Sequence, residues 1–146
     1  MKISINENAP VVEKQQTFIP VAPEIIWQVI SNINDWPKWQ SDVTKAKIMG
    51  PLQEGTVFKW KAGGVNFTSK LHTVLKNKSI GWIGKTFGAK AIHNWFLEPK
   101  DGGTIVYVEE SLQGLLPSLM KSKFSQILQE GMAKNLSELV AVCSSK

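Results

Sequence analysis

The sequence predicts an α+β domain in which a long C-terminal helix covers one face of a curved, seven-stranded antiparallel sheet. Strand-like alternation runs from residue 43 to residue 112, interrupted by short turn sequences such as Gly63-Gly64 and Asp101-Gly102. Links this short join antiparallel neighbours, and no crossover helices separate the strands as a parallel sheet would require. From Pro117 the apolar residues recur at spacings of three and four, which is typical of a helix. The chain has the length of one domain, residues 1–146.

The sequence pattern of the N-terminal part predicts one strand followed by two short helices. After a polar lead over residues 1–10, which we expect to be flexible, Val11–Ile19 alternates like a strand. Pro23 suits the first turn of a helix, and the apolar residues that follow it are too crowded for a surface stripe, so this helix should be well buried. Asp35 can cap a second helical turn over Trp36–Trp39.

Six strands are predicted between these short helices and the final helix. They are Val43–Met49, Thr56–Ala62, Val65–Leu75, Ser79–Thr86, Ala89–Glu98 and Thr104–Leu112. The final helix is expected to begin at Pro117 and to run without interruption. It is the only predicted element long enough to cover a strongly curved sheet.

Turn lengths predict which residues lie opposite each other on neighbouring strands. A two-residue turn at Gly63-Gly64 pairs Trp60 with Phe67 and Phe58 with Ser69, leaving the intervening lysines on the other face. A two-residue turn at Asn77-Lys78 pairs Leu75 with Ile80, Thr73 with Trp82 and Leu71 with Gly84. A two-residue turn at Asp101-Gly102 pairs His93 with Glu110, whereas a three-residue turn there would place Glu109 opposite His93.

The predicted inward face is aromatic, with a few polar side chains. From the sheet it contains Phe58, Trp60, Phe67, Ser69, Leu71, Thr73, Trp82, Ala91, His93, Trp95, Val108 and Glu110, and from the final helix Phe124, Ile127, Leu128 and Gly131. One interpretation is a packed core. The other is an apolar pocket, which would explain why an ionisable pair such as His93 and Glu110 faces inward, where an unsatisfied charge is costly.

Composition excludes several functional classes. All 17 basic residues are lysine, and without arginine the chain lacks the bidentate donor that most often reads guanine, so we expect no nucleic-acid binding. The net charge of +5 is spread over alternating strand positions, as on a solvated sheet face. The single cysteine, Cys143, cannot form an internal disulfide and is expected to be a small buried residue and not a nucleophile.

The sequence predicts no metal and no cofactor. By strand parity His72 faces solvent, so it cannot join His93 in a metal site, and no glycine-rich phosphate loop precedes a helix. The N-terminal residues contain no apolar signal segment, and the chain has no apolar run long enough to span a bilayer. We therefore expect a cytoplasmic protein without stable membrane association.

The order of elements and several motifs resemble a known superfamily. The motifs are the segment Asp35 to Val43 (DWPKWQSDV), the loop Gly50 to Thr56, His93-Asn94-Trp95, and Glu109-Glu110-Ser111 followed by Gly114. Together they resemble the START-like superfamily, and within it the SRPBCC group of polyketide cyclase/dehydrase-like proteins, over roughly Val11 to Val142. The resemblance implies a helix-grip fold, in which the sheet wraps the C-terminal helix and encloses a cavity. It also implies binding of a lipid-like or polyketide-like hydrophobic molecule, with catalysis in a minority of members.

Three functional hypotheses follow. In the first, the domain is a container for a small or medium hydrophobic molecule. In the second it is a cyclase or dehydratase, with His93 as general base, Glu110 as its orienting partner, and Ser69, Thr73 or Asn66 orienting a carbonyl; the alternative for this pair is that it only ties two strands together. In the third, the lysine-rich outer sheet binds a protein partner.

Overall fold

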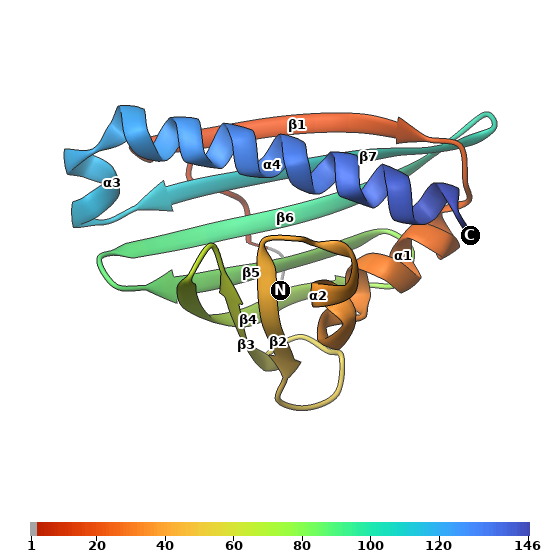
Figure 1. Ribbon diagram of the computed structural model, residues 1–146, viewed down its shortest axis with the longest axis horizontal. Coiled ribbons are helices and arrows are strands. Elements are labelled where there is room, and N and C mark those ends of the chain that lie inside the picture. The colour runs from red at the N-terminus through yellow and green to blue at the C-terminus, as the bar shows by residue number, and fades with distance from the viewer. Residues whose placement is uncertain (1–2) are drawn as a thin grey trace.

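A computed structural model describes residues 3–146 and shows the predicted seven-stranded antiparallel sheet and long C-terminal helix, the helix-grip fold (Figure 1). The elements are β1 (Val11–Ile19), α1 (Pro23–Ser31), the 3₁₀ turn η1 (Ile33–Asp35), α2 (Trp36–Trp39), β2 (Val43–Ile48), β3 (Val57–Ala62), β4 (Val65–Leu75), β5 (Ser79–Thr86), β6 (Ala89–Lys100), β7 (Gly103–Gln113), α3 (Leu115–Leu119) and α4 (Lys121–Ser144). The spatial order of the strands is β1-β7-β6-β5-β4-β3-β2. The first strand in sequence therefore lies beside the last.

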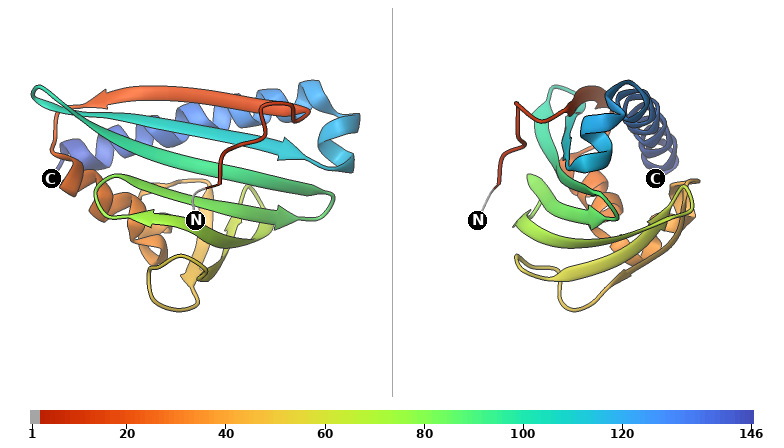
Figure 2. Two further views of the ribbon diagram at one scale, coloured as in Figure 1. Left: turned by 180° about the vertical axis from the view of Figure 1, so that it is seen from behind. Right: turned by 90° about the vertical axis from the view of Figure 1, so that its left-hand side faces the viewer.

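The sheet bends around α4, as an end-on view shows (Figure 2). The helix packs mainly along β1, while η1 and α2 lie beside β2 and α1 contacts α4 and β6 (Figure 1). The buried core gathers where these elements meet, with residues such as Ile26, Phe58 and Leu139 fully enclosed. The curvature thus leaves the concave side bordered by α4 and by the short helices.

The two short helices form as predicted, but the side chain of Asp35 does not cap the second helix as expected. Pro23 begins α1, whose residues Ile26, Trp27 and Val29 are buried. The Asp35 side chain makes no cap hydrogen bond to α2. It instead accepts a hydrogen bond from Asn32 Nδ2 at 3.0 Å, because the intervening residues form a 3₁₀ turn that brings these two side chains together.

The C-terminal segment contains two helices where one was predicted. α3 begins after Gly114, whose φ of 121° lies in the left-handed region that favours glycine. The Leu116 N–H donates to the carbonyl of Gly88 at 3.2 Å, which ties α3 to the β5–β6 turn. Met120 then leaves helical geometry and the chain changes direction before α4 begins at Lys121. The prediction of an uninterrupted helix from Pro117 is wrong for this reason.

Two of the three predicted hairpin registers are confirmed. Trp60 lies opposite Phe67 across the Gly63-Gly64 turn, and His93 lies opposite Glu110 across the Asp101-Gly102 turn. Both glycines of the first turn have positive φ, which a two-residue hairpin turn requires.

The register predicted between β4 and β5 is wrong. The turn there has three residues, since Leu75 pairs with Ser79, and Asn77 takes a left-handed φ of 63°. A bulge at His72 then shifts the pairing again, so that Thr73 lies opposite Gly81 and Leu71 lies opposite Trp82. The pairs predicted around Asn77-Lys78, Leu75 with Ile80, Thr73 with Trp82 and Leu71 with Gly84, do not occur.

The convex face of the sheet is covered at its centre by the N-terminal segment. The Ile3 N–H donates to His72 Nδ1 at 3.1 Å, and Asn94 Nδ2 donates to the Ile3 carbonyl at 3.0 Å. The ring of His72 is consequently buried, so the prediction that it faces solvent is wrong. In the polar lead, Ile3 and Asn6 are hydrogen-bonded to the sheet and Ile5 is buried, while the expectation that this lead is flexible stays a prediction; residues 1–2 lie outside the described part of the chain.

Candidate functional site

A cavity of about 520 Å³ lies between the concave face of the sheet, α4 and α2. Much of its boundary comes from side chains that the sequence placed on the inward face. These are Trp60, Phe67, Trp82, His93, Trp95, Glu110, Phe124, Ile127, Leu128 and Gly131. The alternative of a solidly packed interior does not describe this side of the sheet.

Six residues predicted for the site do not line the cavity. They are Phe58, Ser69, Leu71, Thr73, Ala91 and Val108. Phe58 and Leu71 belong to the fully buried core, and Ser69 accepts a hydrogen bond from Trp60 Nε1 at 3.1 Å. Thr73 is turned to the convex side by the bulge, where its hydroxyl lies 2.8 Å from His72 Nδ1.

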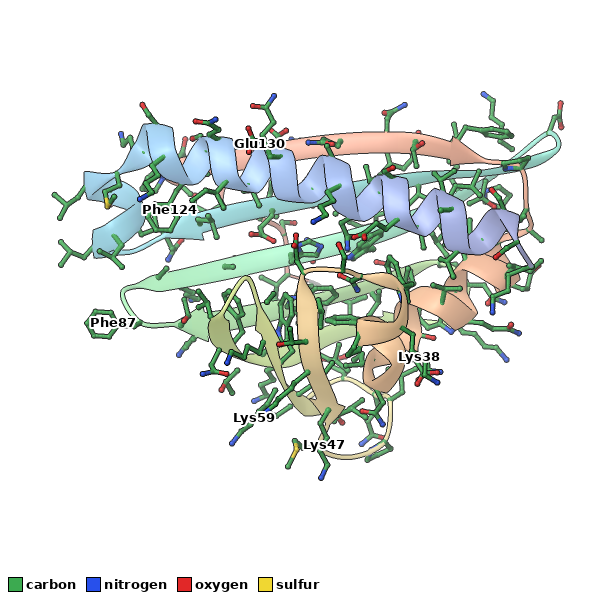
Figure 3. The ribbon with its side chains drawn as sticks, viewed as in Figure 1. Lys38, Lys47, Lys59, Phe87, Phe124 and Glu130 are labelled. Carbon is green, nitrogen blue, oxygen red and sulfur yellow. The ribbon has the colours of Figure 1, made fainter. Side chains whose placement is uncertain are left out.

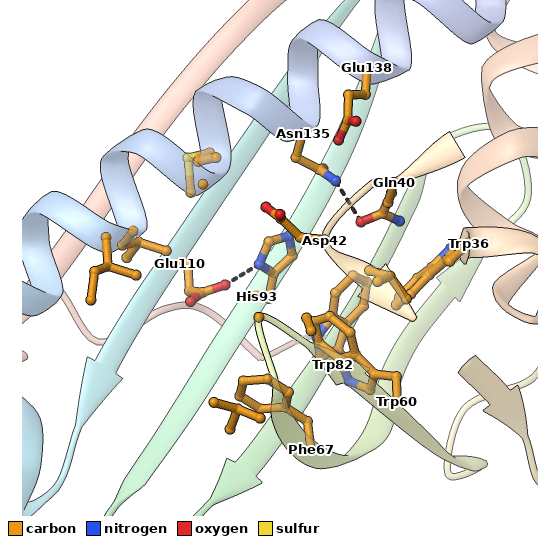
Figure 4. A pocket seen from close by; sticks show the side chains of 18 of the residues that line it. Trp36, Gln40, Asp42, Trp60, Phe67, Trp82, His93, Glu110, Asn135 and Glu138 are labelled. Carbon is orange, nitrogen blue, oxygen red and sulfur yellow. Dashed lines mark hydrogen bonds and ion pairs between the residues drawn. The ribbon is translucent and has the colours of Figure 1, made fainter. Parts of the chain in front are cut away.

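Packed aromatic rings form the wall of the cavity nearest α2 (Figure 4). Trp36 makes edge contacts with Phe58 and Trp60 at ring distances of 5.4 Å, and Phe67 stacks on Trp60 at 4.9 Å. Edge and offset contacts of this kind stabilise aromatic clusters beyond the area they bury. The cluster therefore gives the cavity a stiff, apolar boundary.

His93 and Glu110 form the polar centre of the cavity floor. The ring of His93 projects from β6 into the space beneath α4, and its Nδ1 pairs with Oε1 of Glu110 (Figure 4). The same ring stacks on Trp82 at 4.5 Å with an interplanar angle of 10°. An ionised carboxylate only accepts hydrogen bonds, so in a neutral ring paired with such a carboxylate Nδ1 is the donor and Nε2 is left as an acceptor. This Nε2 is buried and has no partner among the described residues.

A second polar group borders the cavity where α4 approaches the loop after α2. Asn135 Nδ2 donates to Gln40 Oε1 at 2.6 Å, and Glu138 accepts a hydrogen bond from the Ser41 N–H at 3.1 Å (Figure 4). Asp42 pairs with Lys134 at 2.9 Å, and this hydrogen bond raises the pKa of the lysine. We refer to Gln40, Asp42, Asn135 and Glu138 as the polar rim.

The sequence did not predict the polar rim, although a signal was present. The segment Asp35 to Val43 was noted for its resemblance to a family motif, and the structure places its tryptophans and polar residues at the cavity. The other cavity residues that were not predicted come mostly from strand ends and from the short helices α1 and α2, whose inward position depends on the curvature of the sheet. They are Ile30, Trp36, Trp39, Val43, Ala62, Gly63, Val65, Thr86, Leu112 and Met132.

The remaining chemistry of the described residues is limited. Over residues 3–146, no group of three or more histidine, cysteine or acidic side chains is placed to hold a metal ion. The thiol of Cys143 is buried, and burial raises its pKa to about 11, so it stays protonated and unreactive at neutral pH. No helix in the described part of the chain combines the length and the apolar character needed to cross a membrane.

The sheet, the gripped helix and the apolar cavity define a START-like domain of the helix-grip class. A comparison with family models finds a match to the family described as polyketide cyclase/dehydrase and lipid transport, over residues 11–143. The chain belongs to this family. A sequence comparison with curated proteins finds no match.

Solved structures share the fold at low sequence identity. A hypothetical protein of Helicobacter pylori is similar with a TM-score of 0.85 and 15% identity, covering 98% of each chain. An aromatase/cyclase, Zhui, of Streptomyces sp. R1128 has a TM-score of 0.79 and 10% identity over 91% of this chain and 93% of its own. A START superfamily protein of Mycobacterium smegmatis has a TM-score of 0.73 and 17% identity over 89% and 97%. At these identities the likeness shows the fold alone.

Proposed function

We propose that this protein binds a small or medium hydrophobic molecule, lipid-like or polyketide-like, in the cavity beneath α4. The observation that carries the proposal is the cavity itself, about 520 Å³ in volume and walled by indole and phenyl rings. Ligand sites in proteins are typically concave, mostly apolar and supplied with a few polar groups that orient the ligand. His93 and Glu110 supply such groups on the floor of this cavity.

The test is a titration with a neutral, polarity-sensitive dye such as N-phenyl-1-naphthylamine. Saturable binding is expected. Phe67→Ala removes a ring that lines the cavity and should weaken binding about fivefold, which is about the effect of losing one buried apolar contact. The matched control is Phe18→Ala, because Phe18 is 46% exposed on β1 and does not line the cavity. Absence of saturable binding, or equal loss in both variants, would contradict the proposal.

A second candidate function is catalysis at a ketone-bearing ligand, favoured by the unpartnered Nε2 of His93. In this reaction Nε2 takes a proton from the carbon next to the carbonyl, leaving an enolate. The enolate carbon then forms a bond to a second carbonyl carbon of the same molecule, and the new alkoxide takes the proton back from the imidazolium, which restores the neutral ring. Glu110 would hold the ring in the reactive tautomer and stabilise the imidazolium formed.

This step can be measured without knowing the natural ligand. A bound aryl methyl ketone in deuterated buffer should exchange the hydrogens next to its carbonyl, and NMR follows the exchange. His93→Gln should abolish the enzyme-dependent exchange while the affinity for the ketone changes by less than about tenfold. Glu130→Gln, on the outward side of α4, is the control that should leave exchange unchanged (Figure 3). Undiminished exchange in His93→Gln would end the catalytic assignment and leave binding alone.

A further inference from the structure

The charged residues of the chain are distributed unevenly between the surface and the cavity. The chain carries a net charge of +5, and Lys38, Lys47 and Lys59 project from its surface away from the cavity (Figure 3). Of the lysines in residues 3–146, none lines the cavity. The acidic side chains that line it are Asp42, Glu110 and Glu138. A basic protein thus has a cavity whose ionisable lining is acidic apart from one imidazole.

Neighbouring cations do not cancel these carboxylates. At the polar rim, Lys134 pairs with Asp42, which leaves one lysine against the carboxylates of both Asp42 and Glu138. On the floor, His93 faces Glu110, and Glu13 on β1 lies directly opposite Glu110 on the same face of the sheet. The lining keeps an excess of negative charge whether His93 is neutral or protonated.

The tryptophan side chains of the apolar wall also favour a positively charged ligand. Five tryptophans line the cavity: Trp36, Trp39, Trp60, Trp82 and Trp95. An indole ring presents a negative face to its surroundings, and it attracts a cation more strongly than the rings of phenylalanine or tyrosine do. One face of Trp60 is stacked on Phe67 and one face of Trp82 on His93, so a protonated amine would gain from an indole face left uncovered and from the carboxylates. A carboxylate or phosphate is repelled by the same carboxylates.

We propose that the cavity selects by charge: its ligands are hydrophobic amines, with an apolar body among the indole rings and a protonated nitrogen at the acidic lining. Anionic lipids and fatty-acid carboxylates are disfavoured, and neutral molecules bind with intermediate affinity. This inference rests on the proposed function, because it names the class of ligand for the same cavity.

The test uses three probes that share one apolar body: 2-naphthylmethylamine, 2-naphthylmethanol and 2-naphthoate. Isothermal titration calorimetry at neutral pH and low salt should rank the amine tightest and the carboxylate weakest, with about a tenfold difference in Kd between them. The difference should shrink as salt is added, because the rim is open to solvent. If the carboxylate binds as tightly as the amine, the charge preference is refuted.

Variants on α4 separate charge selection from binding itself. Glu138→Gln should weaken the amine about threefold to fivefold and leave the alcohol within about twofold, as expected for one partly exposed charge. Glu138→Lys should bring the carboxylate to at least the affinity of the amine. Glu130→Gln, a matched change outside the cavity, should alter none of the three affinities.

The outcomes distinguish the two proposals. If the neutral alcohol binds and neither glutamate variant changes the order of affinities, charge selection fails while hydrophobic binding stands. If none of the three probes binds to a protein whose circular dichroism is native, the proposed function fails and the charge selection fails with it.

Discussion

Substitutions at Gly131 can change the stability of the protein and its affinity for a ligand independently of each other. It lies in the middle of α4, lines the cavity, and a Cβ atom built on it would have no heavy atom within 4 Å. Glycine inside a helix costs about 1 kcal/mol relative to alanine. Because nothing obstructs the added methyl group, Gly131→Ala should recover most of this energy. In a domain of this size that corresponds to an increase in Tm of about 3 °C, which thermal unfolding followed by circular dichroism measures.

A larger side chain at the same position should act on the cavity. Gly131→Leu keeps a good helix former but extends an isobutyl group toward the space that a ligand would occupy, so the Kd of the neutral dye should rise at least about tenfold without loss of Tm. The control is Ala133→Leu, two residues away on the exposed side of α4 and outside the cavity lining. A lower Tm for Gly131→Ala would show that the helix contacts something at this position. Unchanged dye affinity for Gly131→Leu would show that ligands do not use this part of the cavity.

The remaining predictions concern the convex face, the core and pH. Gly81→Ala would place its Cβ 2.3 Å from Asn94 Oδ1 and 2.5 Å from the ring of His72. This clash should lower the free energy of unfolding, measured by urea titration, by about 1–3 kcal/mol. An unchanged urea midpoint would refute the contact. Trp36→Ala removes a buried ring at the centre of the aromatic cluster and should cost about 3–5 kcal/mol; a smaller loss would mean that the cluster closes around the gap. Because burial raises the pKa of Cys143 to about 11, the unfolded chain releases the thiol proton at lower pH than the folded chain does, and stability falls as pH rises from about 9 toward that value. Cys143→Ala should lack this alkaline component, and equal pH dependence of the two proteins would contradict the assignment.

Residues joined by short turns were predicted best, because local geometry decides their pairing. Two-residue turns brought Trp60 opposite Phe67 and His93 opposite Glu110, as the structure confirms. The β4–β5 hairpin failed because a third turn residue and the bulge at His72 each shift the register by one. Nothing in the alternation of that segment distinguishes a residue on the convex face from one on the concave face once a bulge intervenes, so Thr73 was assigned to the wrong side.

The amino-acid sequence by itself determined the order of strands and helices, the antiparallel sheet and the placement of an imidazole beside a carboxylate, since alternation, turn residues and helix periodicity are local properties. Tertiary structure decided which rings border open space and which fill the core, because that depends on how far the curved sheet stands from α4. It also created the polar rim, which joins Gln40 and Asp42 to Asn135 and Glu138 from segments nearly a hundred residues apart in sequence.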